Sequence, residues 1–136
     1  MTTQEISEIR STVTEFALRN INPEVKRIND FLDNIYPTEK EFPIKENLMQ
    51  RYIILYQIMK DDVAHFHFRK KNGELRSAFG TRSSEIIQQY EKTPQSNPSK
   101  ERTIRGDCVC YFDIEKQAWR SFNVSSLVLV NTNYTI

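Results

Sequence analysis

The chain has 136 residues, of which 38% are hydrophobic and 27% charged, and this composition excludes a disordered chain. The length fits one domain, or one domain with an appendage, and is too short for two independent cores. The net charge of +1 excludes neither nucleic acid nor protein as a partner, but the longest apolar run, Tyr52 to Tyr56, is far shorter than the roughly 20 residues of a membrane span.

Apolar side chains at helical spacing dominate the first part of the chain. Residues 3–20 repeat them every three or four positions, and Thr2 with Glu5 forms a capping box that would start a helix there. A second helix is predicted to begin with Asn22 as its cap and Pro23 in its first turn, and to end before Pro37. Its inward-facing residues are expected to be Val25, Ile28, Leu32 and Ile35.

A third helix is predicted from Pro43 to Lys60, although the run Tyr52 to Tyr56 would also suit a buried strand. Its inward-facing residues are expected to be Leu48, Tyr52, Leu55 and Met59. Asp61 and Asp62 end this pattern, and the period of the apolar residues changes to two. The sequence therefore predicts a helical region of residues 1–62 and a second unit of residues 63–136.

Alternation of period two begins at Val63 and predicts a strand from Val63 to Arg69 with one buried face. The dipeptide Asn72-Gly73 follows, which is a strong hairpin signal because both residues accept a positive φ. Leu75 to Thr81 is therefore expected to be the returning strand.

A polar segment of residues 82–106 comes next, and it is expected to be a long loop with one short helix from Ser84 to Glu91. Three more strands are predicted at residues 107–113, 118–123 and 127–131. Five short antiparallel strands match a small closed barrel better than a sandwich, which needs about seven. The expected fold class is α+β, with N-terminal helices before a five-stranded antiparallel SH3- or Sm-like barrel. Its core is expected to contain Phe66, Phe68, Phe112 and Phe122.

Two stretches, Phe66 to Thr81 and Val109 to Val130, resemble a known family. The first holds the two alternating phenylalanines, the turn Lys70-Lys71-Asn72-Gly73 and Arg76, and the second holds Phe112-Asp113 and the run from Ala118 to Phe122. They are similar to the second WYL-type family of small Sm- or SH3-like barrels, found in phages and bacterial mobile elements. This resemblance covers about half of the chain and implies kinship with ligand-sensing domains that bind nucleic acid or nucleotides.

Basic and aromatic residues of the barrel form the candidate binding site. Cationic side chains neutralise phosphates and an exposed ring stacks a base, so the combination suits single-stranded nucleic acid or a nucleotide, although basic hairpin tips are often merely solvated. Alternation places Phe122 in the core with Ala118 and Arg120 on its side, so Arg120 should be partly buried near a barrel end and Trp119 should lie on the other face. The candidate residues are Arg69, Lys70, Lys71, Arg76, Trp119 and Arg120.

Metal and catalytic chemistry have less support. The pairs His65/His67 and Cys108/Cys110 are zinc-ligand types, but their strands need not be neighbours and no tight ligand loop is present, so no metal or cofactor is predicted. No motif pairs a nucleophile with a base, and three glycines form no phosphate loop, so the chain is not expected to be an enzyme. The start of the chain lacks the pattern of a signal peptide, and cysteines two apart on a strand seldom form a disulfide, so a cytoplasmic location is expected.

The charges are divided unevenly along the chain. Residues 1–62 carry 11 acidic and 8 basic residues, a net charge of −3, whereas residues 63–136 carry 7 and 11, a net charge of +4. The resemblance implies a phage or mobile-element binding protein, and the basic second part of the chain leads us to expect that its barrel recognises nucleic acid or a nucleotide. The alternative is a protein-interaction module, such as an accessory, inhibitor or virion-associated protein, that binds its partner through the helices and the 82–106 loop. The helices could also form a dimer interface. A small-molecule sensor ranks third.

Overall fold

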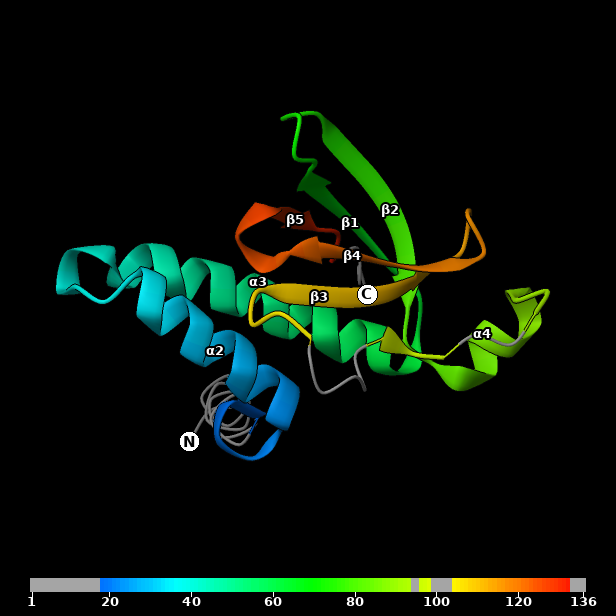
Figure 1. Cartoon of the computed structure of the whole chain (residues 1–136), viewed down its shortest axis with the longest axis horizontal. Coiled ribbons are helices and arrows are strands. Elements are labelled where there is room, and N and C mark those ends of the chain that lie inside the picture. Colours follow the sequence, from blue (N-terminus) through cyan, green and yellow to red (C-terminus); the bar gives the residue numbers. More distant parts are fainter. Residues whose placement is uncertain (1–17, 94–95, 99–103, 133–136) are drawn as a thin grey trace, which may run out of the picture.

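A computed structural model describes residues 18–93, 96–98 and 104–132 of the chain (Figure 1). The helices are α2 (Pro23–Ile35), α3 (Phe42–Asp61) and α4 (Ser84–Tyr90), with short 3-10 turns η1 (Glu39–Glu41) and η3 (Val124–Ser126). The strands are β1 (Ala64–Arg69), β2 (Leu75–Thr81), β3 (Cys108–Asp113), β4 (Ala118–Asn123) and β5 (Leu127–Val130). The helix predicted for residues 3–20 lies almost wholly outside the described residues.

The capping signals place α2 where the sequence predicts it. The side chain of Asn22 accepts hydrogen bonds from the backbone amides of Glu24 (3.0 Å) and Val25 (3.1 Å), which satisfies two donors of the first turn. Val25 and its predicted inward partners Ile28 and Leu32 are fully buried. Ile35 is instead 39% exposed, because it lies in the last turn of the helix, where the chain leaves the core before Pro37.

Helix α3 supplies the layer that covers the sheet. Its four predicted inward residues, Leu48, Tyr52, Leu55 and Met59, are all buried, so the helical interpretation of this segment is confirmed. The helix packs against α2 on one side and against β1, β2 and β5 on the other. In the part of the chain that the structure describes, no helix is long and apolar enough to cross a membrane.

The five strands form one antiparallel sheet in the order β4-β3-β2-β1-β5. Strand β2 pairs with β1 from Leu75 to Gly80 but with β3 only at Gly80 and Thr81, which bends the sheet. Helices followed by five antiparallel strands confirm the predicted α+β fold class. The edge strands β4 and β5 form no pairing with each other, so the sheet is not closed as the sequence predicts. Helix α3 packs across the interior face and covers the core there, so the sheet need not close on itself.

Aromatic rings fill the core under the sheet. Phe66 packs edge-on against Tyr111 with ring centroids 5.1 Å apart, and Phe68 stacks on Phe122 at 4.8 Å. Phe112 is buried but points to the opposite face, where its ring meets that of Trp119 at 5.9 Å. The prediction that Phe112 belongs to the core of the other phenylalanines is therefore wrong, and Tyr111 takes that place.

One contiguous core joins the helices to the strands. Buried side chains of α2 and α3, such as Leu32 and Met49, belong to the same cluster as Phe66 and Tyr111 of the sheet. The predicted boundary at residue 62 falls between α3 and β1. Whether residues 1–62 and 63–136 behave as separate domains stays a prediction.

The β1–β2 hairpin turns through Lys70 to Gly73. The amide of Gly73 donates to the carbonyl of Lys70 (2.9 Å), and the amide of Lys70 donates to the carbonyl of Glu74 (2.8 Å), the pattern of a type I turn followed by a bulge. Gly73 has a φ of 89°, whereas Asn72 does not have a positive φ and instead accepts a hydrogen bond from the amide of Glu74 at its side chain (3.0 Å). The expectation that both turn residues adopt positive φ is thus correct only for Gly73.

Replacing Gly73 by alanine should lower the free energy of unfolding by about 1 kcal/mol, because alanine resists a positive φ. A Cβ there would meet no atom within 4 Å, so backbone strain is the sole steric cost. Denaturant melts of Gly73→Ala and of the neighbouring Lys71→Ala, expected to be neutral, measure this. Equal stability of Gly73→Ala and wild type would show that the turn tolerates another conformation.

Candidate functional site

Three of the six candidate residues, Arg69, Lys70 and Lys71, are exposed at the tip of the β1–β2 hairpin. Arg69 donates from Nη1 to the carbonyl of Gly73 (3.0 Å), and Nζ of Lys70 lies 3.7 Å from a carboxylate oxygen of the exposed Glu74. Such an exposed ion pair contributes little stability, since water screens it. The tip therefore keeps most of its positive charge available to a ligand.

Arg76 is held by the protein itself. Its Nη2 donates to Oδ2 of Asp113 at 2.5 Å, and its guanidinium carbon lies 5.9 Å from the centre of the Phe68 ring. The side chain of Asp113 is 1% exposed and that of Arg76 is 19% exposed. Asp113 also accepts from the amide of Lys116 (3.0 Å), so this ion pair ties the β1–β2 hairpin to the β3–β4 turn. Arg76 consequently has a structural role beside any role in binding.

Trp119 and Arg120 lie on opposite faces of β4, as alternation predicts. Trp119 lies opposite Phe112 of β3 and is half-buried, so its ring is not free to stack a base. Arg120 lies opposite Tyr111. Arg120 is exposed rather than partly buried, because β4 is an edge strand and the long side chain passes the edge into solvent. The structure therefore does not bring Trp119 to the same face as Arg76 and Arg120.

The hydroxyl of Tyr111 lies at the end of the core near these arginines. It is buried and has no hydrogen-bond partner among the described residues. Burial raises the pKa of Tyr111 to about 12, with Asp113 adding to the rise and Arg76 and Arg120 opposing it. At neutral pH this group is therefore a neutral phenol.

The outward face of the β1–β2 hairpin carries rings that sequence analysis did not assign to a site. Phe79 lies directly opposite His65 in the register, and the two rings stack with centroids 4.3 Å apart and an interplanar angle of 10°. The ring of His67 follows at 4.8 Å from that of His65. The signal in the sequence was the alternation itself, which put the histidines on the face opposite Phe66.

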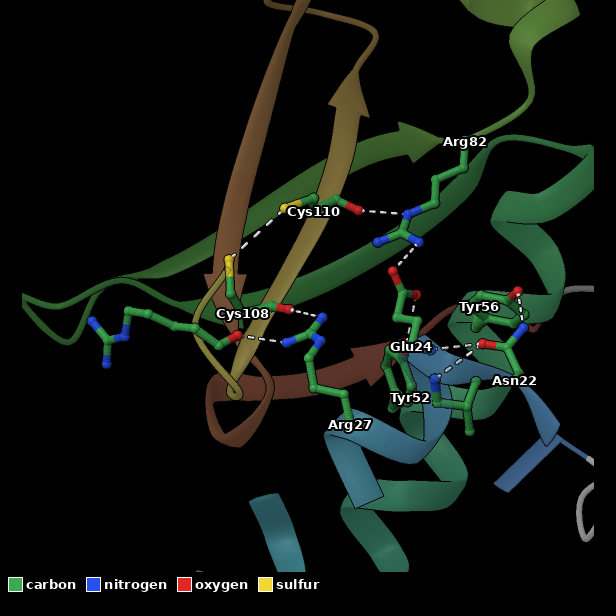
Figure 2. Close-up of polar contacts among 10 residues, drawn as sticks. Asn22, Glu24, Arg27, Tyr52, Tyr56, Arg82, Cys108 and Cys110 are labelled. Carbon is green, nitrogen blue, oxygen red and sulfur yellow. Dashed lines mark hydrogen bonds and ion pairs between the residues drawn. The ribbon is translucent and has the colours of Figure 1, made fainter. Parts of the chain in front are cut away.

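The first half of β3 is held by arginines on the edge where β2 does not pair with it. Arg27 donates to the carbonyls of Arg105 and Cys108 (2.5 and 2.9 Å), and Arg82 donates from Nε to the carbonyl of Cys110 (2.8 Å) (Figure 2). Strand β2 pairs with β3 only at two residues further along, so these guanidinium groups replace the missing β2 donors. The helices are thereby fastened to the sheet.

Arg82 belongs to a partly buried polar network under this edge (Figure 2). Its Nη1 forms an ion pair with Glu24, whose other carboxylate oxygen accepts from the hydroxyl of Tyr52 (2.7 Å). Burial, and then the charge of Glu24, raise the pKa of Tyr52 well above its ordinary value, so Tyr52 stays protonated as the donor. Nearby, the amide of Asn22 donates to the hydroxyl of Tyr56 (2.6 Å).

The two cysteines lie side by side on β3 with their sulfurs 3.8 Å apart, and both are free thiols. Burial, followed by the neighbouring Cys108, raises the pKa of Cys110 to about 12, so Cys110 is protonated at neutral pH. His65 and His67 lie on β1, which β2 separates from β3. Within the described ranges, no three histidine, cysteine, aspartate or glutamate side chains come together as a metal site requires.

Comparison with known proteins gives two matches. The model of the WYL_2 family, described as an Sm-like SH3 beta-barrel fold, matches residues 52–128, from the middle of α3 into β5. The chain is also similar to the "Uncharacterized 11.5 kDa protein in Gp31-cd intergenic region" of Enterobacteria phage T4. The identity is 27% over 94 residues, which cover 69% of this chain and 83% of the phage protein. No solved structure matches significantly.

Proposed function

The chain belongs to the WYL_2 family of Sm-like SH3 β-barrel fold, and we propose that it is a binding module, not an enzyme, that recognises nucleic acid or a nucleotide through phosphate groups. The similarity to a phage protein supports a setting in the cytoplasm of a bacterial host. We infer the kind of ligand from the positive charges of the hairpin and β4, since a fold alone does not identify a ligand.

The observation that carries the proposal is a set of exposed cations without carboxylate partners. Among the residues that the structure describes, no carboxylate forms an ion pair with Arg69, Lys71 or Arg120, and Lys70 meets only the exposed Glu74. The hairpin also extends away from helices α2 and α3, so its tip is open to a ligand (Figure 1). Unpaired cations on a projecting element attract phosphates and lose little by binding them, because no internal pair is broken.

Reversing both Lys70 and Lys71 to glutamate should weaken binding to all oligonucleotide sequences alike and lower the salt slope of the binding constant by about two, since each lost phosphate contact contributes nearly one unit. Fluorescence anisotropy with labelled single-stranded and duplex oligonucleotides, over a range of salt concentrations, measures this. The matched control reverses Lys26 and Lys60 of the helices, which gives the same change in net charge and should leave the slope unchanged. A wild-type protein without salt-dependent binding at micromolar concentration would rule the proposal out.

The second candidate function is a protein-interaction module, and a feature of the helices favours it. A hollow of about 520 Å³ lies where α2 ends and α3 begins, lined in part by Tyr36, Pro37 and Phe42. Phe42 is 54% exposed and Ile44 beside it is 50% exposed. An apolar interface at this end would depend little on salt, so the same titrations separate the two functions.

A further inference from the structure

We propose that the outward face of the β1–β2 hairpin is a stacking surface for the bases of single-stranded nucleic acid, with Phe79 as its open platform. This inference rests on the proposed function, because it names the kind of nucleic acid and the surface that reads it. It replaces Trp119 as the aromatic part of the site.

The rings of this face form a continuous row. Phe79 stacks on His65 in nearly parallel fashion, and His65 contacts His67 in turn, with centroids 4.3 and 4.8 Å apart. Phe79 remains 37% exposed although His65 covers one face of its ring. A base could therefore continue the stack on the solvent side of this row, as bases do on exposed rings of single-strand-binding proteins.

The middle ring of the row is fixed in place. Nε2 of His65 hydrogen-bonds Oγ of Ser77 (2.6 Å), and Nδ1 of His65 pairs with Nδ2 of Asn131 (2.5 Å). Because an amide nitrogen donates, Nδ1 is the acceptor and Nε2 carries the hydrogen that Ser77 accepts. A ring held at both nitrogens loses little conformational entropy when a base stacks beside it, so the surface is preorganised.

The charge of this face suits a phosphate backbone. The outward positions of β1 are His65, His67 and Arg69, and those opposite them on β2 are Phe79, Ser77 and Leu75. None of these six residues is acidic, and Arg69 leads directly into the Lys70-Lys71 tip. Rings followed by cations along one hairpin are the combination that sequence-tolerant single-strand binding requires.

The other aromatic rings of the sheet are not available in this way. Phe68 and Phe122 are buried in the core, and Trp119 presents its ring to Phe112. A duplex keeps its bases stacked on each other, so its base faces would not reach a flat sheet surface. A protein partner would favour a centre depleted of ionisable groups, which the two histidines and Arg69 oppose.

The test compares Phe79→Ala with Tyr90→Ala, a matched control that trims an aromatic side chain of similar exposure on α4, outside the proposed surface. The probe is a labelled oligodeoxythymidine of about 15 nucleotides, beside the same sequence as a duplex. Phe79→Ala should weaken binding to the single strand by roughly 5- to 150-fold, with the salt slope unchanged, since stacking is lost and phosphate contacts are kept. Tyr90→Ala should bind as wild type.

A second variant, Phe79→Trp, keeps the platform and adds a fluorescent reporter. It should bind at least as tightly as wild type, and its tryptophan emission should be quenched by the oligonucleotide. The sole tryptophan of the wild type, Trp119, should not be quenched, because it lies on another strand against Phe112.

The outcomes separate this inference from the function on which it rests. If wild type binds the single strand and Phe79→Ala binds equally well, the platform is wrong while the proposed function stands. If wild type binds no oligonucleotide, the function itself fails. If wild type elutes as a dimer that Phe79→Ala converts to a monomer, the face is an interface between copies of the chain, and the inference is overturned.

Discussion

Replacing Gly80 by alanine should lower the free energy of unfolding by about 3 kcal/mol, because the added methyl group overpacks the aromatic core. A Cβ at Gly80 would lie 2.6 Å from Cδ2 of Tyr111 and 3.0 Å from Cε1 of Phe66. Both rings are fully buried and packed against each other, so neither can move aside without displacing the aromatic core. Denaturant melts followed by circular dichroism measure the loss.

Gly106 provides the matched control for this substitution. A Cβ there would meet Phe31 at 3.4 Å, an ordinary contact, so Gly106→Ala should change stability by less than about 0.5 kcal/mol. Shortening Tyr111 should relieve its clash with the alanine at position 80. Gly80→Ala combined with Tyr111→Leu should therefore lower the free energy of unfolding by less than the sum of the two single changes. Strict additivity would mean that the alanine does not press on Tyr111.

The faces of the strands could be predicted only where one face is solvated. In β1, Ala64, Phe66 and Phe68 are buried and the residues between them are not, so alternation located the strand and its core side. In β3, every residue from Val109 to Asp113 is buried, so the pattern carries no information about which side faces the main core. For this reason the sequence predicts Phe112 in the place that Tyr111 occupies.

The candidate site was predictable in its residue types but not in its arrangement. The cations of the hairpin were recognisable from the sequence, since the turn that exposes them is a local signal. The row of rings depends on the pairing of Phe79 with His65, and this register follows from a turn with a bulge that the dipeptide Asn72-Gly73 alone does not specify. The ion pair of Arg76 with Asp113 joins residues 37 positions apart, and no local pattern announces it.

The association of helices and sheet also escaped prediction, because it depends on polar contacts between distant segments. Arg82 immediately follows β2, yet its guanidinium joins Glu24 of α2 to the backbone of Cys110. Opposite net charges in the two parts of the chain were visible in the sequence and are compatible with this attraction. The specific partners follow only from the bend of β2 away from β3.

Replacing Arg82 by methionine should therefore lower the free energy of unfolding by about 3 kcal/mol. The side chains of Arg82 and Glu24 are only 12% and 17% exposed, so the change leaves a largely buried carboxylate without its cation. It also leaves the carbonyl of Cys110 without the Nε donor. Arg51→Met is the matched control: Arg51 donates to the carbonyl of Val128 (3.1 Å) but holds no buried carboxylate, so about 1 kcal/mol is expected.

The same variant shows whether the helices and the sheet unfold together. Trp119 lies in β4, so its fluorescence reports the sheet, whereas circular dichroism at helical wavelengths reports mainly α2 and α3. Since one core joins the two, both signals should shift to lower denaturant in a single coincident transition. Combining Arg82→Met with Glu24→Gln should cost less than the sum of the single changes, because the buried charge is removed along with its partner. A fluorescence transition that stays in place while the helical signal is lost would instead show that residues 1–62 and 63–136 are independent domains.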